Sequence, residues 1–528
     1  MADFWQIPYR TPRQPLLARN VVATSQPLAA QAGLRMLQEG GNAVDAAVAA
    51  AITLTVVEPT GNGVGSDAFV QVWDGTQLHG INGSGRSPAA WSAEHFSRYD
   101  TMPLLGWDAV TVPGAVSVWA ALSKRFGVLP FATLFRAGID YARQGFPVAP
   151  ITAHRWREMA DTFREFPEFC RVFLPGGSPP SPGTLVRFPE LAETLEELAL
   201  TDGESFYRGA LAERICRCAN EQGGLLSNDD LAGHQPLWVS PLAIDYRGYT
   251  LHELPPNGQG VAALLALGLL ERFDLAAEPV DSPGSIHLQA EAMKLAFADV
   301  FQHLADPRAM RIDGSILLDP AYLDERARLI DPRRASFPEP GLPAEPGTVY
   351  LAAADDRGMM VSLIQSNYFG FGSGIVVPGT GISLHNRGAG FTLETGHPNQ
   401  VAGGKRPFHT IIPAFVTKAG RPVMAFGVMG AHMQAQGHVQ MMTRTFDYRQ
   451  HPQAASDAPR WQVNHDLSLS LEDGFPIAVA EQLARRGHRI ISDVPTHVFG
   501  GAQLIRRMED GWYLAGSDHR KDGQAVGF

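Results

Sequence analysis

Apolar residues near the beginning of the chain repeat with helical spacing over two adjacent stretches. The first, SQPLAAQAGLRMLQEGG, starts at an expected capping serine, Ser25, and ends at the glycine pair 40–41. The second, NAVDAAVAAAITLTVVEP, is almost wholly apolar up to Pro59. Such caps and breakers are typical of helices. Residues 68–83, AFVQVWDGTQLHGING, instead predict a strand, an Asp-Gly turn and a second strand.

Helical spacing returns later in the chain, whereas the last third begins and ends in strand-like runs. We predict helices over 191–200, 209–222, 286–304 and 434–446. The simplest arrangement of this pattern has strands in the middle and helices on both outer sides. Strands and helices do not alternate regularly, which argues against a Rossmann sheet or a TIM barrel.

A proline-rich stretch separates the helix-rich part of the chain from Thr348. Five prolines between residues 331 and 347 keep this stretch extended at the surface, because each fixes φ and lacks a backbone donor. From Thr348 the chain reads as an apolar strand, a turn at 355–358 and a second apolar strand, which predicts a β-hairpin. A buried strand thus starts directly behind an exposed linker, although a threonine there could also be no more than a good strand former.

Composition narrows the partners of the chain. Its 528 residues, 45% of them hydrophobic, suffice for a large core, and length alone allows two to four domains. The 43 basic and 54 acidic residues are dispersed along the sequence and give a net charge of −11. We therefore expect neither nucleic acid nor an anionic membrane as a partner.

Targeting signals and cysteines bear on where the protein works. No apolar segment follows a basic one at the N-terminus, and the longest apolar run, 46–57, is too short to span a bilayer. Cys170, Cys216 and Cys218 form neither a disulfide framework nor a CxxC metal pair. We therefore expect a cytoplasmic protein with ordinary reduced thiols.

Three short motifs suggest chemistry that their context does not support. GNGVGSD, residues 61–67, is glycine-rich but follows a helix and leads into a strand, the reverse of the dinucleotide fingerprint, so we predict a ligand-lining turn. No serine has the two flanking glycines of a nucleophile elbow. His432 and His438 are six residues apart, unlike a helical zinc pair, and we expect neither a metal nor a cofactor.

The segment GVMGAHMQ, residues 427–434, is a glycine-rich turn between a predicted strand and a predicted helix. Successive backbone N–H groups at Gly430 and Ala431 could converge there on a developing oxyanion. Small residues at these positions would let a substrate come close. By composition alone the segment could equally be a plain strand-to-helix turn.

Six segments of the chain together resemble one known family. They are VATSQPLAAQAGLRMLQEGGNAVDAAVAAA, VVEPTGNGVGSDAF, GTVYLAAADDRGMMVSLIQS, GTGISLHNRGAGF, GKRPFHTIIP and GSDHRKDGQAVGF. In order and spacing, from about Val21 to the C-terminus, they resemble the gamma-glutamyltranspeptidase family of N-terminal nucleophile hydrolases. The resemblance implies an α/β (α+β) fold, a four-layer αββα sandwich in which two fragments of one precursor form a single structural domain.

The resemblance also implies that the chain matures by cutting itself between Gly347 and Thr348. A large fragment, 1–347, and a small fragment, 348–528, would stay together as a heterodimer that could pair into a heterotetramer. Thr348 would be the nucleophile. Its freed α-amino group would be the base, because a threonine hydroxyl attacks poorly until a base takes its proton.

Three further positions match the family's catalytic residues. Ser366 would hydrogen-bond the nucleophile, and the N–H groups of Gly430 and Ala431 would form the oxyanion hole. The family's usual Pro-Gly-Gly reads Met-Gly-Ala here. Both backbone donors survive this change, but the β-carbon of Ala431 narrows the approach to them.

The substrate positions depart from the family's pattern. Typical members hold the α-amino and α-carboxylate groups of glutamate with an asparagine, an acidic residue, a serine pair and an arginine. The matching positions here are Tyr368 (or Asn367 with a one-residue shift), Gly390, His409, Thr410 and Ala93. Arg387 instead occupies the position where the family usually has an amide or acidic side chain, and Arg86 lies in the segment GSGRSP, which borders the family's carboxylate site. Cations with no carboxylate to meet an ammonium predict an acyl group carrying only a carboxylate. Either arginine could alternatively be a structural ion-pair partner.

With these departures and no export signal, the sequence resembles the cytoplasmic branch of the family that includes oxamate amidohydrolase. We predict a small carboxylate-bearing amide as substrate, first of all oxamate, with Thr348 attacking the amide carbon. A γ-glutamyl hydrolase or transferase is the second hypothesis, and a cephalosporin-acylase-like activity on a dicarboxylic side chain is the third. An uncut, non-enzymatic binding or structural protein is the alternative from another class, and the intact Thr348 and Ser366 argue against it.

Overall fold

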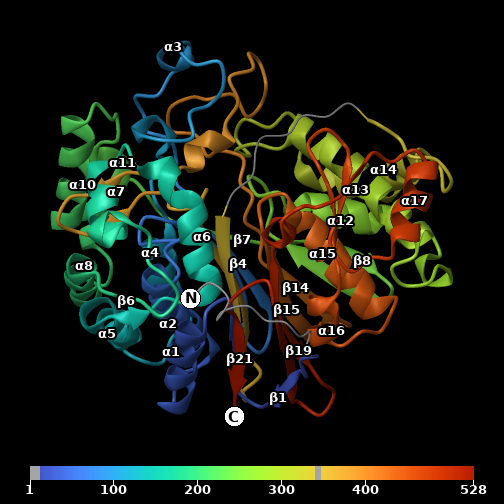
Figure 1. Ribbon diagram of the computed structural model, residues 1–528, viewed down its shortest axis with the longest axis horizontal. Helices are drawn as coiled ribbons and strands as arrows, with labels where there is room; N and C mark the ends of the chain where they lie inside the picture. Colours follow the sequence, from blue (N-terminus) through green and yellow to red (C-terminus); the bar gives the residue numbers. More distant parts are fainter. Residues whose placement is uncertain (1–11, 339–346) are drawn as a thin grey trace.

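Two seven-stranded antiparallel sheets lie face to face at the centre of the protein. The computed structural model describes residues 12–338 and 347–528 (Figure 1). The first sheet, called the β10 sheet, has the strand order β21 (Gln524–Gly527), β2 (Val21–Thr24), β10 (Gly347–Ala354), β11 (Met360–Tyr368), β3 (Asp67–Trp73), β4 (Leu78–Asn82) and β7 (Leu237–Val239). The second, called the β15 sheet, has the order β1 (Leu16–Ala18), β20 (Tyr513–Ser517), β19 (Gly501–Arg507), β15 (Arg421–Met429), β14 (Ala414–Lys418), β9 (Tyr249–Glu253) and β8 (Leu242–Tyr246).

Helices cover the outer side of each sheet, at the left and right of Figure 1. Those packed on or near the β10 sheet are α1 (Pro27–Gln38), α2 (Ala43–Val57), α4 (Ala115–Phe126), α5 (Arg136–Gln144) and α8 (Pro189–Leu200). Those packed on or near the β15 sheet are α12 (Gly260–Leu270), α13 (Pro283–His303), α14 (Pro320–Ala327), α15 (Met433–Phe446) and α16 (Pro452–Asp457). The four layers confirm the αββα sandwich predicted from the sequence.

Smaller elements surround these layers. The remaining helices are α3 (Ala93–Phe96), α6 (Pro150–Ala160), α7 (Pro167–Phe173), α9 (Ser205–Arg208), α10 (Ala210–Glu221), α11 (Asn228–Ala232) and α17 (Ile477–Arg485). The remaining strands are β5 (Phe146–Pro147), β6 (Leu185–Val186), β12 (Val376–Val377), β13 (Ile382–Ser383), β16 (Trp461–Val463), β17 (Leu469–Leu471) and β18 (Ile490–Ile491). The central sandwich, and not these smaller elements, is the scaffold of the candidate site.

The apolar pattern of the sequence explains the layers. Helix α2 is buried along its whole length, which is why it is apolar on every side, and a capping box of Asn42 and Asp45 starts it. Strands β10 and β11 lie between the two outer layers and their described side chains are buried. Tyr350, Phe415 and Ile505 belong to the apolar cluster between the two sheets. Burial of these faces against each other holds the four layers together.

The predicted hairpins at 68–83 and after Thr348 are present as β3–β4 and β10–β11. One local prediction is wrong. The cap of α1 is Gln26, whose side chain accepts from two backbone N–H groups, and not Ser25. The Ser25 hydroxyl donates instead to Glu58, 2.5 Å away, because burial of that carboxylate demands a donor.

The two predicted fragments share both sheets. In the β10 sheet, β10 and β11 follow the predicted cut and lie between β2 and β3, which precede it. In the β15 sheet, β14 pairs with β9, and β20 pairs with β1, so the same mixing recurs at two places. Neither of the two seven-stranded sheets is therefore built by one fragment alone.

Part of the predicted linker is described. Pro332 and Pro338 lie in irregular backbone before residue 339, whereas Pro340, Pro343 and Pro346 fall outside the described residues.

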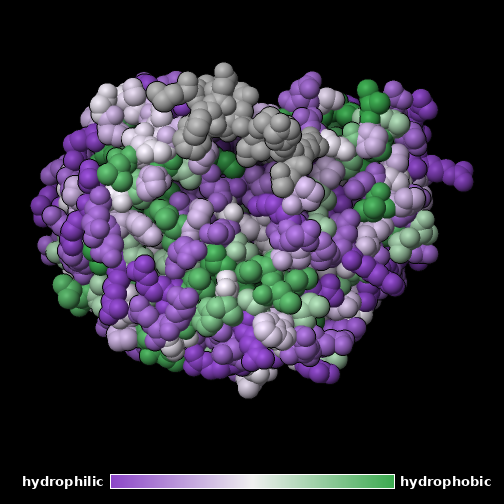
Figure 2. Space-filling view, turned by 60° about the horizontal axis from the view of Figure 1, so that its bottom comes forward, coloured by the Kyte–Doolittle hydropathy of each residue, from purple (hydrophilic) through white to green (hydrophobic). Residues whose placement is uncertain are grey.

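Figure 2 shows one face of the molecule on which hydrophilic residues dominate and hydrophobic residues gather below the centre. In the part of the chain that the structure describes, no helix combines the length and the apolar character needed to cross a membrane.

Candidate active site

A β-bulge aims two side chains at each other where β10 begins. The register runs from the pair Gly347 and Tyr368 to the pair Val349 and Gln365, so two residues of β11 face Thr348 alone. The Thr348 and Ser366 hydroxyl oxygens are 3.2 Å apart, and both side chains are buried. The Tyr368 N–H donates to Ser366 Oγ at 2.8 Å, which fixes that hydroxyl. The bulge thus places a second hydroxyl beside the predicted nucleophile.

The turn between β15 and α15 supplies the predicted oxyanion donors. Gly430 has φ 109° and Ala431 has φ 50°, so both residues lie in the left-handed region. The side-chain amide of Gln259 donates to Ala431 O at 2.8 Å and to Thr410 O at 2.6 Å. This single amide ties the predicted oxyanion turn to the predicted substrate segment. A left-handed non-glycine residue costs about 1–2 kcal/mol, so contacts such as that of Gln259 must hold it.

Arg387 is fully buried and only partly hydrogen-bonded. Its Nη1 donates to Thr410 Oγ1 at 2.8 Å, and its guanidinium carbon lies 4.5 Å from the ring centre of Tyr368. Among the described residues, its Nε and Nη2 have no hydrogen-bond partner. Burial lowers the pKa of Arg387 to about 10, while the charge of Asp67 raises it, so the guanidinium stays protonated near neutral pH. A buried cation with two open donors calls for an anionic ligand.

Asp67 lies at the start of β3 and is surrounded by donors. His409 Nε2 lies 3.0 Å from its Oδ2, and His385 Nε2 lies 3.6 Å from its Oδ1. The Gly114 N–H donates to Oδ1 at 3.0 Å. Burial raises the pKa of Asp67 to about 7, against the lowering effect of Arg387. The sequence predicted cations without a carboxylate in this pocket. That prediction is incomplete, because Asp67 contributes a buried carboxyl.

Both histidines of this cluster are neutral. Burial lowers the pKa of His385 to about 3 and that of His409 well below its ordinary range, and the charge of Arg387 lowers both further. The predicted substrate residue His409 thus contacts Asp67 and packs on Phe69 at 4.6 Å between ring centres. Its role in this arrangement is to hold the carboxyl that faces Arg387.

Two further positions of the predicted substrate site are Asn367 and Gly390. Asn367 accepts from Ser66 at 2.8 Å, and its Nδ2 has no partner among the described residues, so Asn367 adds a further open buried donor to the two of Arg387. Gly390 leaves no room for the family's acidic residue: an added β-carbon would lie 2.5 Å from Phe408 O. The backbone around Gly390 is therefore too close for an acidic side chain at this position.

Arg86 is not part of the same arrangement. Its Nη1 donates to Asp306 at 3.1 Å and to Gly404 O at 3.1 Å, and a third of its side chain is exposed. The Asp306 carboxylate also pairs with Arg308. These contacts are those of a structural ion pair, the alternative role named above for Arg86.

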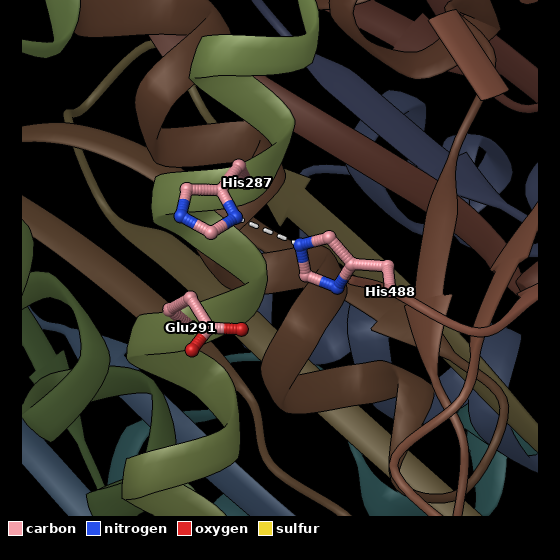
Figure 3. A group of neighbouring side chains, drawn as sticks. All are labelled: His287, Glu291 and His488. Carbon is pink, nitrogen blue, oxygen red and sulfur yellow. Dashed lines mark hydrogen bonds between the residues drawn. The ribbon is translucent and has the colours of Figure 1, made fainter. Parts of the chain in front are cut away.

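One group of side chains has the composition of a metal site (Figure 3). Within the described ranges, His287, Glu291 and His488 are the only such group, and all three are buried. Lys294 contacts two of the three residues: its Nζ donates to Glu291 at 2.8 Å and to His488 Nδ1 at 3.4 Å. Glu291 also accepts from the Ser336 N–H at 2.7 Å. An ammonium group already balances this carboxylate, so the cluster does not fit a metal ion.

The histidines considered from the sequence have other partners. His438 Nδ1 lies 2.6 Å from the buried Glu253 carboxyl, and His432 Nδ1 lies 2.9 Å from Gln259 Oε1. Burial lowers the pKa of His438 to about 3 and raises that of Glu253 well above its ordinary range, so this pair shares one proton as neutral groups. They hold helix α15 against β9 and α12.

Sequence reasoning missed Asp67, His385 and Gln434 as members of the site. Gln434 Nε2 lies 3.4 Å from Thr348 Oγ1, across 86 residues of sequence. Asp67 and Gln434 both lie inside motifs quoted above, GNGVGSD and GVMGAHMQ. Their place in those motifs was the available signal. The contacts themselves arise only when α15 meets β10 and when the segments of His385 and His409 meet β3.

Comparisons with known proteins agree with this geometry. The sequence profile of the family described as Gamma-glutamyltranspeptidase matches residues 29–528. A glutathione hydrolase-like proenzyme of Bacillus subtilis (strain 168) is 36% identical over 519 residues, covering 96% of this chain and 98% of that protein. An oxamate amidohydrolase proenzyme of Klebsiella pneumoniae subsp. pneumoniae is 36% identical over 518 residues, covering 95% and 97%.

A solved structure extends the likeness to the whole fold. A cephalosporin acylase from Bacillus halodurans has a TM-score of 0.96 to this chain at 46% sequence identity, covering 99% of this chain and 98% of that one. The family predicted from the six sequence segments is thereby confirmed. This chain belongs to the gamma-glutamyltranspeptidase family of N-terminal nucleophile hydrolases and is an amidohydrolase.

Proposed function

We propose that the chain cuts itself before Thr348 and then hydrolyses a small amide that carries a carboxylate on its acyl side. One observation carries the substrate class: Arg387 is buried, and two nitrogens of its guanidinium, Nε and Nη2, have no hydrogen-bond partner in the described ranges 12–338 and 347–528. Two neighbouring N–H groups of a planar guanidinium match the two oxygens of a carboxylate. A substrate carboxylate would satisfy both donors and neutralise the buried charge.

The contacts of Tyr368 and Gln259 support a place for this carboxylate near Thr348. Tyr368 packs against Arg387 through its ring and donates to Ser366 through its N–H. Gln259 holds the backbone of Thr410, the hydrogen-bond partner of Arg387, together with that of Ala431. The carboxylate pocket and the reaction centre thus share supporting residues, which favours an acyl group whose acid is close to the amide carbon.

Maturation would begin with attack of the Thr348 hydroxyl on the Gly347 carbonyl carbon. The C–N bond between these residues breaks, the acyl group moves to Thr348 Oγ as an ester, and the Thr348 nitrogen becomes a free amino group. Water then hydrolyses the ester. The products are residues 1–347, ending in a carboxylate, and residues 348–528, beginning with the nucleophile.

Turnover would use the same hydroxyl. The α-amino group of Thr348, with an ordinary pKa of about 7.7–8.0, takes the hydroxyl proton as the oxygen attacks the substrate amide. The N–H groups of Gly430 and Ala431 meet the oxyanion, and the amine leaves with the proton. Water then attacks the ester and releases the acid. For oxamate, one water converts the amide into oxalate and ammonium.

Oxamate remains the first substrate of this proposal, because its carboxylate is bonded directly to the amide carbon. A γ-glutamyl group would need a carboxylate for its ammonium. The Asp67 oxygens already accept from Gly114 and face His409, and Gly390 excludes the family's acidic side chain. Both facts support an acyl group without an ammonium.

An amide with a longer dicarboxylic acyl chain is the second candidate. The observation in its favour is the likeness over 99% of the chain to a cephalosporin acylase at a TM-score of 0.96. Such an acyl group also ends in a carboxylate, so it would use Arg387 in the same way. The two candidates differ in how far the carboxylate lies from the scissile bond.

The proposal requires no metal or cofactor, because the nucleophile, the base and the oxyanion donors all come from the chain. Its fragments would act as a heterodimer, which could pair into a heterotetramer. A cytoplasmic location remains a prediction, and the three unpaired thiols agree with a reducing compartment.

Ammonia release from purified, cut protein tests the substrate class. Oxamate and oxamide differ only in the carboxylate, so kcat/KM should be well above background for the first and near background for the second. Glutathione and a glutaryl amide complete the panel. Ready turnover of glutathione without turnover of oxamate would promote the γ-glutamyl hypothesis, and a precursor that never cuts before Thr348 would contradict the mechanism itself.

A further inference from the structure

Gln434 is a buried polar residue in direct contact with the predicted nucleophile. It lies in the first turn of α15, and its side chain is fully buried. Its Nε2 lies 3.4 Å from Thr348 Oγ1, and its Oε1 lies 3.0 Å from the Ile412 backbone nitrogen. The second contact joins Gln434 to the segment that also carries Thr410. One amide therefore spans the nucleophile and the predicted substrate segment.

The orientation of this amide follows from its partners. A backbone N–H can only donate, so the Ile412 nitrogen requires the carbonyl oxygen of Gln434 on its side. The NH2 group must then face Thr348. An NH2 group can only donate, so the Thr348 oxygen is the acceptor in this contact. The hydroxyl proton of Thr348 is consequently directed away from Gln434, toward Ser366 or toward the α-amino group.

We propose that Gln434 is a catalytic residue that donates a hydrogen bond to the reacting oxygen of Thr348. The inference rests on Thr348 being the nucleophile and deepens that proposal. The donor stabilises negative charge on Oγ when the α-amino group removes its proton. It acts again when Oγ leaves the acyl-enzyme during deacylation, because the charge returns to the same atom.

The position of Gln434 supports this role. The start of α15 is the positive end of a 14-residue helix, which favours charge development beside it. Thr348 is also buried, so a donor acts there in surroundings with little water to compete. A contact of 3.4 Å is long for a ground-state bond and leaves room to shorten as the oxygen gains charge.

Gln434→Met tests the donor at nearly constant volume, and Gln436→Met is its matched control. Gln436 lies two residues along α15, is equally buried, and uses its amide on the backbone of Val463 and not on Thr348. Loss of one donor at a developing oxyanion costs roughly 100- to 1000-fold in kcat. For this longer contact we expect a fall in kcat of about 10- to 100-fold with little change in KM. The control variant should keep wild-type kcat.

Gln434→Glu supplies a readout that a structural role would not change. Near pH 8 the new carboxylate has no proton to donate and repels charge on Oγ, so turnover should be very low. Toward pH 5 the carboxyl can be protonated and donate, so the ratio of variant to wild-type kcat should rise as the pH falls. A ratio that is constant with pH would contradict the donor role.

Self-cleavage makes the test independent of the substrate. The same oxygen attacks Gly347, so Gln434→Met should slow the appearance of a fragment that begins with Thr348, whereas Gln436→Met should not. Cleavage elsewhere in the wild-type chain would overturn the nucleophile assignment and not this contact specifically. Correct cleavage and unchanged kcat in Gln434→Met, with wild-type folding by circular dichroism, would overturn the inference about Gln434.

Discussion

The guanidinium carbon of Arg387 lies 4.5 Å from the ring centre of Tyr368, while the Tyr368 backbone donates to the Ser366 hydroxyl. Tyr368 has φ 77°, a left-handed conformation that is rare for an aromatic residue. That conformation lets one residue place its N–H on the reaction centre and its ring under the cation. The strain at Tyr368 therefore coincides with the place where the two parts of the candidate site meet.

Removal of the Arg387 charge should weaken recognition of a carboxylate. We expect Arg387→Met to lower kcat/KM for a carboxylate-bearing amide roughly 30- to several thousand-fold. This corresponds to a loss of about 2–5 kcal/mol of transition-state binding free energy. Arg387→Lys should recover only part of this loss, because an ammonium cannot present a bidentate fork. Steady-state kinetics with oxamate measures both. Equal loss for oxamate and for an amide without a carboxylate would assign Arg387 to structure.

Two neighbouring substitutions test the turn that carries the oxyanion donors. Ala431 has φ 50°, so Ala431→Gly should relieve strain and leave the unfolding free energy unchanged or higher by up to about 1 kcal/mol, with kcat retained. Gly430 has φ 109°, and an added β-carbon would lie 3.1 Å from Gly500 Cα. Gly430→Ala should therefore lose activity. Steady-state kinetics and urea denaturation should show that Ala431→Gly keeps its activity and stability and that Gly430→Ala loses activity. An active Gly430→Ala beside an inactive Ala431→Gly would contradict the assigned backbone geometry.

Asp67 should give the folded chain a distinctive dependence on pH. Folding raises its pKa from 3.8 to about 7, so between these values the folded chain holds a proton that the unfolded chain has released. The carboxyl therefore favours folding at low pH, and this contribution to the unfolding free energy is lost as the pH rises through about 4 to 7, at about 1.4 kcal/mol per pH unit. Thermal unfolding of Asp67→Asn and wild type at pH 5 and pH 8 measures the difference.

We expect the stability of wild type relative to Asp67→Asn to fall between those two pH values. The charged and titratable groups near this carboxyl are His409, His385, Arg387 and Arg406. Both histidines stay neutral across the window because burial lowers their pKa, and both arginines stay charged, with pKa values of about 10. Comparison with the variant removes the contributions of all other acids. A difference that is constant with pH would show that Asp67 ionises normally.

The sequence predicted the scaffold well because its signals are local. The apolar run of α2, the hairpin after Thr348 and the placement of strands between outer helices follow from periodicity and breakers, which act over a few residues. The four-layer αββα order itself was implied by the family resemblance. The Ser25 cap failed because a residue 33 positions away, Glu58, competes for the hydroxyl. The partners in the site are farther apart still: His409 and Asp67 are separated by 342 positions. No spacing rule links such residues before the sheets form.

Treatment with a chelator should leave turnover and stability unchanged, because Lys294 already supplies the positive charge in the cluster of His287, Glu291 and His488. Lys294→Met should instead leave the Glu291 carboxylate buried without its partner and lower the unfolding free energy by about 3–5 kcal/mol. Adding Glu291→Gln should restore part of that loss. Urea denaturation with and without a chelator measures these changes, and a metal-reversible loss in wild type would refute this assignment.

The two fragments should remain associated after cleavage until the whole fold melts. The pair β10 and β11 lies between β2 and β3, which precede the cut. In the other sheet the block β20, β19, β15 and β14 lies between β1 and β9, which also precede it. Separation would expose strand edges and apolar faces in both sheets. Native mass spectrometry of cut protein should give the mass of the full chain plus one water, and fragments should dissociate in urea at the same concentration at which circular dichroism reports unfolding. Dissociation well below that concentration would mean that the shared sheets do not hold the fragments together.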